Sequence, residues 1–242
     1  MHLIFFVFIY NKDMEEKLSA FLELSEKFEN NGLSLFLVGG TVRDYLLEIP
    51  LSDMDAVTDA TPEEMKRFLP DLQMTFARFG SVVFKTKKKV KFDITTMRAE
   101  KAYSDSRHPA EISFVKDLNI DVKRRDFTVN ALYMDKNLKV IDLVDGVKDI
   151  KSHTLRMVGD PEIRLKEDPL RIIRALRFSA DYDLKIEPSL SNAIKNNIGL
   201  LEKLNIEKIN QDIKKTNKDK KVQLIQLFEE YDIKHLLDVL NY

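Results

Sequence analysis

The chain of 242 residues contains no cysteine. It can therefore form no disulfide framework, no thiol nucleophile and no cysteine-ligated zinc site, and this composition fits a reducing cytoplasm. Lysine and arginine together number 39 and aspartate and glutamate 40, which gives a formal net charge of −1. The chain thus lacks a global basic field, and any contact with RNA must come from local clusters of basic residues.

Long hydrophobic runs are also scarce. Residues 1–10 form the most apolar stretch, and it is only about half of the ~20 residues that a bilayer span needs. It lacks the basic flank and the small-residue cleavage site of a signal peptide. We interpret it as a packed or adventitious leader, with Met14 as an alternative natural start, and we expect no membrane association.

Hydrophobic periodicity predicts an α+β fold, with a mixed α/β head to about residue 150 and a helical section after it. Gly32 is placed to end the first helix, and Thr61, Pro62 and Glu64 form the signature of a capped helix start. The helices that we expect cover residues 12–30, 41–48, 61–68, 162–182 and 187–240; the strands cover residues 33–38, 53–57, 82–86, 90–95, 112–115 and 138–143. Residues 87–89 should form a hairpin turn, residues 98–109 a mobile polar loop, and residues 125–131 a helix or turn.

Two glycines and two aspartates follow the first expected strands. Gly39 and Gly40 lie at a strand-to-helix junction shortly before Arg43, and Asp53 and Asp55 lie in the next strand. Paired glycines let the backbone approach an anion, and the start of a helix favours a triphosphate. Because side chains alternate along a strand, both carboxylates face the same side. This arrangement predicts a Mg²⁺ site suited to two-metal phosphoryl displacement.

A third carboxylate, Asp93, lies within the strand expected at residues 90–95. Phe92 and Ile94 occupy one face of that strand, so Asp93 points to the other. If this strand neighbours the first pair of aspartates, Asp93 could accept the proton of an attacking 3′-hydroxyl. The alternative is an exposed strand aspartate without a chemical role.

Basic residues lie beside carboxylates in a further segment, Arg124, Arg125 and Asp126. Adjacent arginines next to a carboxylate suit phosphate and ribose contacts, and Phe127 would anchor the turn in the core.

The residues Asp168, Arg171, Arg174 and Arg177 recur every three positions. This spacing traces one slowly rotating face of a helix. Asp168 can accept a hydrogen bond from an exocyclic amine, and Arg171 can donate to a ring nitrogen or a carbonyl oxygen. Cytosine and adenine share those groups on their Watson–Crick edges, in contrast to uracil and guanine. The alternative is a solvated ladder of ion pairs.

Four of these segments resemble the motifs of class II tRNA nucleotidyltransferases (CCA-adding enzymes) and bacterial poly(A) polymerases. They are LVGGTVRD at residues 37–44, DMD at residues 53–55, RRDFTVNA at residues 124–131 and EDPLR at residues 167–171. The resemblance implies a polymerase-β-like nucleotidyltransferase head with a mixed sheet over residues 25–150, after an N-terminal leader and helix over residues 1–24. An all-helical, nucleotide-selecting neck over residues 151–200 and a truncated helical body over residues 201–242 would follow.

The resemblance also implies residue roles. The triphosphate would be held by Gly39, Gly40 and Arg43, and the Mg²⁺ ions by Asp53 and Asp55. The incoming nucleotide would be contacted by Arg125 and Asp126. An amino-acid template would be formed by Asp168 and Arg171, and the nucleotide or its phosphates would also be contacted by Arg174 and Arg177. Members of the family often carry glutamate where this sequence has Asp93.

The activity that the resemblance implies is the addition of CCA to tRNA 3′ ends from CTP and ATP in the cytoplasm. The polar residues 98–107 resemble the flexible loop that helps the family change from CTP to ATP, which argues against an enzyme limited to two cytidines. An A-adding enzyme or a poly(A) polymerase is the alternative, since Pro169 also occurs among poly(A) polymerases. A non-catalytic RNA-binding module is a third.

The sequence departs from the family in one respect. Family members usually continue through larger body and tail domains, whereas about 40 residues follow Leu201 here. We expect either a minimal enzyme in which the lysines of residues 85–91 and 214–221 contact phosphates, or an enzyme that relies on a partner subunit or a homo-oligomer.

Overall fold

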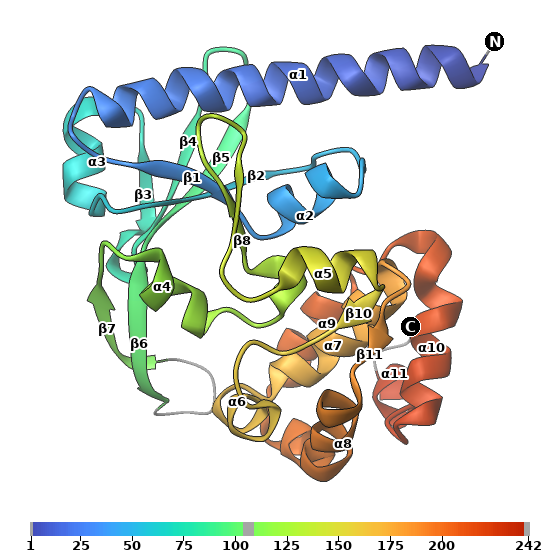
Figure 1. The fold of residues 1–242 in the computed structure, drawn as a ribbon. Coiled ribbons are helices and arrows are strands. Elements are labelled where there is room, and N and C mark those ends of the chain that lie inside the picture. The colour runs from blue at the N-terminus through green and yellow to red at the C-terminus, as the bar shows by residue number, and fades with distance from the viewer. Residues whose placement is uncertain (1, 104–108, 240–242) are drawn as a thin grey trace. The chain divides into compact units, whose positions relative to one another are not determined.

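The computed structural model describes residues 2–103 and 109–239 (Figure 1). Its contacts divide the chain into two compact units. The first, which we call the head unit, consists of residues 1–100, 112–125 and 130–146. The second, the helical unit, consists of residues 101–111, 126–129 and 147–242.

A seven-stranded mixed sheet forms the centre of the head unit, with the order β3-β4-β5-β2-β1-β8-β9. Its strands are β1 (Leu35–Val38), β2 (Met54–Thr58), β3 (Gln73–Phe76), β4 (Ser81–Lys85), β5 (Lys91–Thr96), β8 (Leu132–Met134) and β9 (Val140–Asp142). The β2–β5 pair of this sheet is parallel, and the other neighbours are antiparallel. The mixed sheet confirms the expected fold class.

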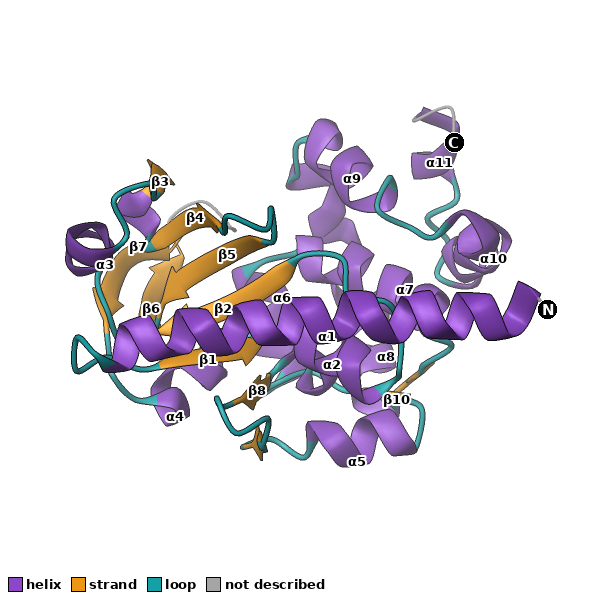
Figure 2. Ribbon diagram, turned by 90° about the horizontal axis from the view of Figure 1, so that it is seen from above, coloured by secondary structure: helices purple, strands orange, loops and turns teal. Residues whose placement is uncertain are grey.

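Helix α1 (His2–Glu29) runs across the sheet (Figure 2). The other helices of the head unit are α2 (Gly40–Leu46), α3 (Pro62–Phe68) and α4 (Leu118–Asp121), with 3₁₀ turns at Ala77–Phe79 and Val122–Arg124. Phe28 of α1 packs edge-on against Phe68 of α3, with ring centroids 5.0 Å apart. As expected, Gly32 ends the first helix: it has a φ of +71°, and the N–H of Leu33 reaches back to the carbonyl of Phe28 at 3.0 Å.

Residues 98–109 were expected to form a loop, and this expectation was wrong for most of them. They contribute β6 (Arg98–Tyr103), which pairs with β7 (Pro109–Phe114) in a separate two-stranded sheet. The sequence of β6, RAEKAY, has no regular alternation of apolar and polar residues, so periodicity did not indicate a strand there. Residues 104–108, the centre of the expected flexible loop, lie outside the described residues.

The helical unit packs around α7 (Leu170–Asp181), most of whose residues are buried. Its other helices are α6 (Pro161–Glu167), α8 (Pro188–Asn197), α9 (Ile206–Ile213), α10 (Lys221–Glu230) and α11 (His235–Val239), with 3₁₀ turns at Ile198–Lys203 and Lys218–Lys220. Two short strands, β10 (Thr154–Leu155) and β11 (Lys185–Ile186), form a parallel pair. The 3₁₀ turn Thr128–Asn130 and helix α5 (Gly146–Lys151) belong to this unit except for Asn130 and Gly146, which are counted with the head unit. Within the described part of the chain, no helix is both long and apolar enough to cross a bilayer.

Residues 162–182 are helical, as expected, but they form two helices. Asp168 has an extended backbone, with φ −143° and ψ 94°, and it separates α6 from α7. The residue before a proline is disfavoured in the helical region, and Pro169 follows Asp168 directly. The periodic pattern continues across this break and did not indicate it.

The expected N-terminal cap of α3 is confirmed. The Thr61 hydroxyl accepts from the N–H of Glu64 at 3.2 Å, and the Glu64 carboxylate accepts from the N–H of Thr61 at 2.7 Å. Each side chain thus satisfies one backbone donor that the first helical turn leaves unpaired.

We expect Thr61→Ala to lower the free energy of unfolding by about 1 kcal/mol, because it removes the acceptor of one half of this box. Urea unfolding followed by circular dichroism measures the change. Thr61→Ser keeps the hydroxyl and is the matched control, expected to unfold close to the wild type. Equal losses in the two variants would contradict a capping role.

Candidate active site

A glycine turn connects the end of β1 to α2 in the head unit. Gly39 has φ +66° and ψ −130°, a backbone conformation that residues with a Cβ rarely adopt. A Cβ on Gly39 would lie 4.0 Å from Asp55 Oδ2, and one on Gly40 would lie 3.4 Å from Arg43 Nη2. The two glycines therefore leave open backbone beside a carboxylate and a guanidinium.

The three candidate carboxylates come together on the adjacent strands. Asp55 of β2 is the direct cross-strand partner of Asp93 of β5, and Asp53 immediately precedes β2. The Thr41 hydroxyl accepts from the N–H of Asp55 at 2.8 Å and donates to the carbonyl of Asp53 at 3.2 Å. This contact ties the aspartate segment to the first turn of α2. The strand of Asp93 thus neighbours the aspartate pair, which is the condition for Asp93 to accept a proton there.

The electrostatics of this cluster favour a bound cation. Burial raises the pKa of Asp55, and the carboxylates of Asp93 and Asp53 raise it further, to about 6, although Arg125 and Arg43 act in the opposite direction. The ionised form of Asp55 is therefore disfavoured in this buried site, and a bound cation would stabilise it. Among the described residues, no group of three or more His, Cys, Asp or Glu side chains is arranged to hold a metal ion alone. A pair of carboxylates nevertheless fits Mg²⁺, which commonly binds through one or two carboxylates together with substrate phosphates.

Lys91 belongs to the same cluster; the sequence placed it among the lysines expected to contact phosphates, but its position beside the carboxylates was not predicted. Its Nζ lies 2.8 Å from Asp93 and 3.8 Å from Asp53. The signal was present in the sequence, because residues two apart on a strand share a face and Lys91 precedes Asp93 by two positions.

Arg43 projects from α2 and is almost fully buried. Its Nε donates to Asp44 at 2.9 Å, and its Nη1 donates to the side-chain oxygen of Asn130. These contacts fix the guanidinium next to Gly40.

Arg125 is held by a buried carboxylate that was not singled out from the sequence. Asp121 accepts from Arg125 Nη2, Arg124 Nε and the Tyr133 hydroxyl, each at 2.8 Å. Burial alone would raise the pKa of Asp121, but the two arginines and the hydrogen bond from Tyr133 outweigh it and hold the pKa at about 2. Asp121 therefore stays ionised and fixes the position of Arg125.

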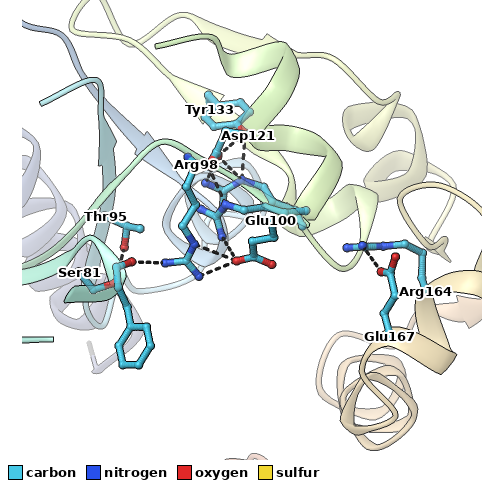
Figure 3. Close-up of polar contacts among 11 residues, drawn as sticks. Ser81, Thr95, Arg98, Glu100, Asp121, Tyr133, Arg164 and Glu167 are labelled. Carbon is cyan, nitrogen blue, oxygen red and sulfur yellow. Dashed lines mark hydrogen bonds and ion pairs between the residues drawn. The ribbon is translucent and has the colours of Figure 1, made fainter. Parts of the chain in front are cut away.

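Figure 3 shows how this network continues into β6. Arg98 donates to Glu100 and to the carbonyl of Phe79, and its backbone N–H donates to Asp121 at 3.2 Å. A second ion pair drawn in Figure 3, Arg164 with Glu167, belongs to the helical unit.

The helical unit holds the remaining candidate residues. Asp126 accepts from Arg174 Nε at 2.9 Å, and the guanidinium of Arg174 also lies 3.6 Å from Asp212 of α9. Burial raises the pKa of Asp126, but the adjacent Arg174 holds it below its ordinary value. Arg177 donates to Asp212 at 2.7 Å and to Asp181 at 3.3 Å. The expected alternative of a solvated ladder is wrong for Arg177, because only 7% of this residue is exposed.

Asp168 and Arg171 lie at the break between α6 and α7. The Asp168 carboxylate accepts from the N–H of Leu170 at 3.1 Å. Arg171 is 5% exposed, and its Nη1 donates to the carbonyl of Arg164 at 2.7 Å and to Glu167 at 3.3 Å. Backbone and side-chain contacts thus restrict both side chains to defined positions.

The candidate residues therefore fall into two groups. The head unit brings together Gly39, Gly40, Arg43, Asp53, Asp55, Asp93 and Arg125. The helical unit contains Asp126, Asp168, Arg171, Arg174 and Arg177.

A mixed sheet whose neighbouring strands present carboxylates beside a glycine turn defines a nucleotidyltransferase head. Residues 35–156, about half of the chain, match the family model described as the poly A polymerase head domain. The chain belongs to this family.

Curated relatives and solved structures agree with this assignment. The chain is 42% identical over 198 residues to the CCA-adding enzyme of Ligilactobacillus salivarius (strain UCC118), covering 82% of this chain and 49% of that protein. It is 42% identical over 190 residues to the CCA-adding enzyme of Lactobacillus helveticus (strain DPC 4571), covering 78% and 47%. The structure of the Bacillus stearothermophilus CCA-adding enzyme in complex with CTP superimposes with a TM-score of 0.82 at 30% identity, covering 90% of this chain and 53% of that one. The chain thus spans about half the length of the curated relatives that it matches.

The pKa of Asp55 generates a prediction about stability. The folded pKa of about 6 lies above the ordinary value of 3.8, so the folded state binds more protons than the unfolded state between these values. Stability is therefore lost as the pH rises through this window. We expect Asp55→Asn to raise the free energy of unfolding above pH 6 by up to about 3 kcal/mol, and this gain to shrink as the pH falls towards 4.

Urea unfolding at several pH values, with and without Mg²⁺, tests the prediction. At pH 7.5, Mg²⁺ should stabilise the wild type and not Asp55→Asn, because a ligand stabilises only a fold that binds it. Asp71→Asn removes an exposed carboxylate and is the matched control, expected to behave as the wild type. A pH-independent difference between Asp55→Asn and the wild type would contradict the assigned pKa.

Proposed function

We propose that this chain adds CCA to the 3′ end of tRNA from CTP and ATP, without a nucleic-acid template and with Mg²⁺. The observation that carries the proposal is the register that sets Asp55 opposite Asp93, with Asp53 close by, beside the glycine turn. The relatives named as CCA-adding enzymes, and the related Bacillus stearothermophilus enzyme solved in complex with CTP, support this substrate class. A tRNA substrate and the absence of cysteine both favour the cytoplasm.

The residues of the head unit fit an attack of the 3′-oxygen on the α-phosphorus of the nucleotide. The bond between the α-phosphorus and the bridging oxygen to the β-phosphate breaks, and pyrophosphate leaves. Asp93 accepts the proton of the attacking hydroxyl and passes it to solvent. Gly40 and Arg43 bind the triphosphate, because the open glycine backbone lies directly beside the guanidinium. Arg125, fixed by Asp121, contacts the incoming nucleotide.

Asp53 and Asp55 would hold Mg²⁺. Burial and the neighbouring carboxylates of Asp93 and Asp53 raise the pKa of Asp55, and a divalent cation at this position would stabilise its ionised form. When bound, Mg²⁺ supplies neutralisation of the charge that develops on the phosphate oxygens.

Nucleotide choice belongs to the helical unit in this proposal. Asp168 accepts from the exocyclic amine of cytosine or adenine, and Arg171 donates to the ring. Their own contacts to Leu170, Arg164 and Glu167 set the positions from which they would do so. Asp126 and Arg174 hold each other and complete the nucleotide-binding face, while Arg177 supports it through Asp212.

An extension assay tests the activity. A tRNA that ends at its discriminator base is incubated with Mg²⁺ and CTP, ATP or both, and the products are separated at single-nucleotide length. We expect two additions with CTP and a third when ATP is also present. Asp53→Asn should lower the rate by more than about 100-fold, because it removes a ligand of a cation that contributes several kcal/mol to the transition state. Asp71→Asn is the matched control.

Growth with ATP alone would overturn CCA addition in favour of an A-adding enzyme or a poly(A) polymerase. No growth with any nucleotide would overturn catalysis by this chain and favour an RNA-binding module.

Nucleotide choice has its own prediction. Asp168→Asn keeps the oxygen that accepts from Leu170 but places an NH₂ group where a carboxylate oxygen was. We expect kcat/KM for CTP and ATP to fall by about 10- to 100-fold relative to UTP and GTP. The amide NH₂ and the exocyclic amine of the base are both donors, so the hydrogen bond between residue 168 and the base is lost. Asp183→Asn changes an exposed carboxylate of the same unit and should leave selectivity intact. Equal losses for all four nucleotides would exclude a role of Asp168 in selection.

A further inference from the structure

The tip of the β4–β5 hairpin concentrates positive charge. Residues 85–91, which we call the lysine hairpin, contain five lysines in seven positions: Lys85, Lys87, Lys88, Lys89 and Lys91. The turn is tight, because the N–H of Lys89 donates to the carbonyl of Thr86 at 2.9 Å. Lys85 and residues 87–89 are exposed.

Folding alone does not account for this charge. Lys85 is the direct cross-strand partner of Lys91. Like charges opposite each other destabilise a pair of strands. Lys88 forms an exposed ion pair with Glu23 of α1 at 2.9 Å, but within the described residues no acidic side chain pairs with Lys85, Lys87 or Lys89. The hairpin thus bears an excess of positive charge that a bound polyanion would relieve.

The lysine hairpin is continuous with the carboxylate cluster. Lys91 shares a face of β5 with Asp93, and its Nζ contacts that carboxylate at 2.8 Å. Lys85 lies opposite Lys91 on the same face of β4. A row of cations therefore begins at the proposed proton acceptor and extends outward along the hairpin.

The sheet order separates two phosphate-binding regions. In the order β4-β5-β2-β1, the lysine hairpin joins β4 to β5, whereas the glycine turn with Arg43 follows β1. The carboxylates of β5 and β2 lie between them. In-line displacement needs the attacking and leaving oxygens on opposite sides of the phosphorus. If the triphosphate lies at the glycine turn, the RNA strand that supplies the attacking hydroxyl approaches from the hairpin.

We propose that the lysine hairpin binds the sugar–phosphate backbone of the RNA whose 3′ end is extended. This inference rests on the proposed function and adds a partner surface to it. The lysines of residues 214–221 share no strand with the carboxylates, and Lys220 is already paired with Asp183 at 2.6 Å. The hairpin is the better of the two basic segments for holding the RNA end.

Binding of a tRNA that lacks CCA, measured by fluorescence anisotropy without nucleotide and over a range of KCl concentrations, tests the inference. The test variant is Lys85→Gln/Lys87→Gln/Lys89→Gln. The matched control is Lys116→Gln/Lys123→Gln/Lys139→Gln, which removes three exposed lysines of the head unit and gives the same net charge. Thermal unfolding and CTP binding are measured for both variants.

We expect the hairpin variant to bind tRNA about 10-fold more weakly and the salt slope, log K against log [KCl], to become shallower by about two, since each lost phosphate contact removes roughly 0.7 to 0.9. The control should match the wild type. CTP affinity should be unchanged in both variants. This result would show that the lysines bind the phosphates of the RNA backbone and not those of the nucleoside triphosphate.

Equal losses of tRNA affinity in the two variants would overturn the inference, as would no measurable binding of tRNA by the wild type at low salt. Loss of CTP affinity with unchanged tRNA binding would assign the hairpin to the triphosphate instead. A chain that fails the extension assay but shows the hairpin effect would refute the proposed function and leave the RNA surface standing.

Discussion

The parallel register between β2 and β5 is the constraint on which the head unit depends. It holds Asp55 and Asp93 on strands about 4.8 Å apart, where two ionised carboxylates repel each other. The opposite face of β5 offsets this repulsion, because Phe92 and Ile94 are fully buried there. A shift of β5 by one residue relative to β2 would expose the side chains of Phe92 and Ile94 and bury that of Asp93 in the core. The hydrophobic core thus fixes the carboxylates in a geometry that their charges oppose.

Buried carboxylates position the motif arginines in both units. Asp121 holds Arg124 and Arg125 in the head unit, and Asp212 holds Arg177 in the helical unit. A buried ion pair contributes little net stability, but removal of one partner leaves an uncompensated charge and costs about 3 to 5 kcal/mol. These pairs therefore restrict where each guanidinium lies rather than adding much to the stability of the fold.

The elements of the fold and the residues of the site could be predicted from the sequence wherever a local sequence signal agrees with the tertiary structure. The capping box at Thr61, the glycine that ends α1 and the shared face of the aspartates follow from local backbone rules. Strand β8 was missed, because all three of its residues are buried and it has neither alternation nor length. Asp121 was missed although Arg124 and Arg125 follow it at helical spacings of three and four residues. Its burial and its contact with Tyr133 of β8 depend on the tertiary fold. Pairings of this kind are set by the tertiary fold and leave no periodic trace in the sequence.

The break before Pro169 changes how the period-three cluster is understood. As one helix, Asp168, Arg171, Arg174 and Arg177 would share a slowly rotating face. The extended backbone of Asp168 instead places its carboxylate at the start of α7, where it accepts from Leu170. Along α7 the three arginines then have different partners, from Glu167 at its start to Asp212 on α9. The irregular backbone at Asp168 therefore sets this carboxylate apart from the three arginines, which all belong to α7.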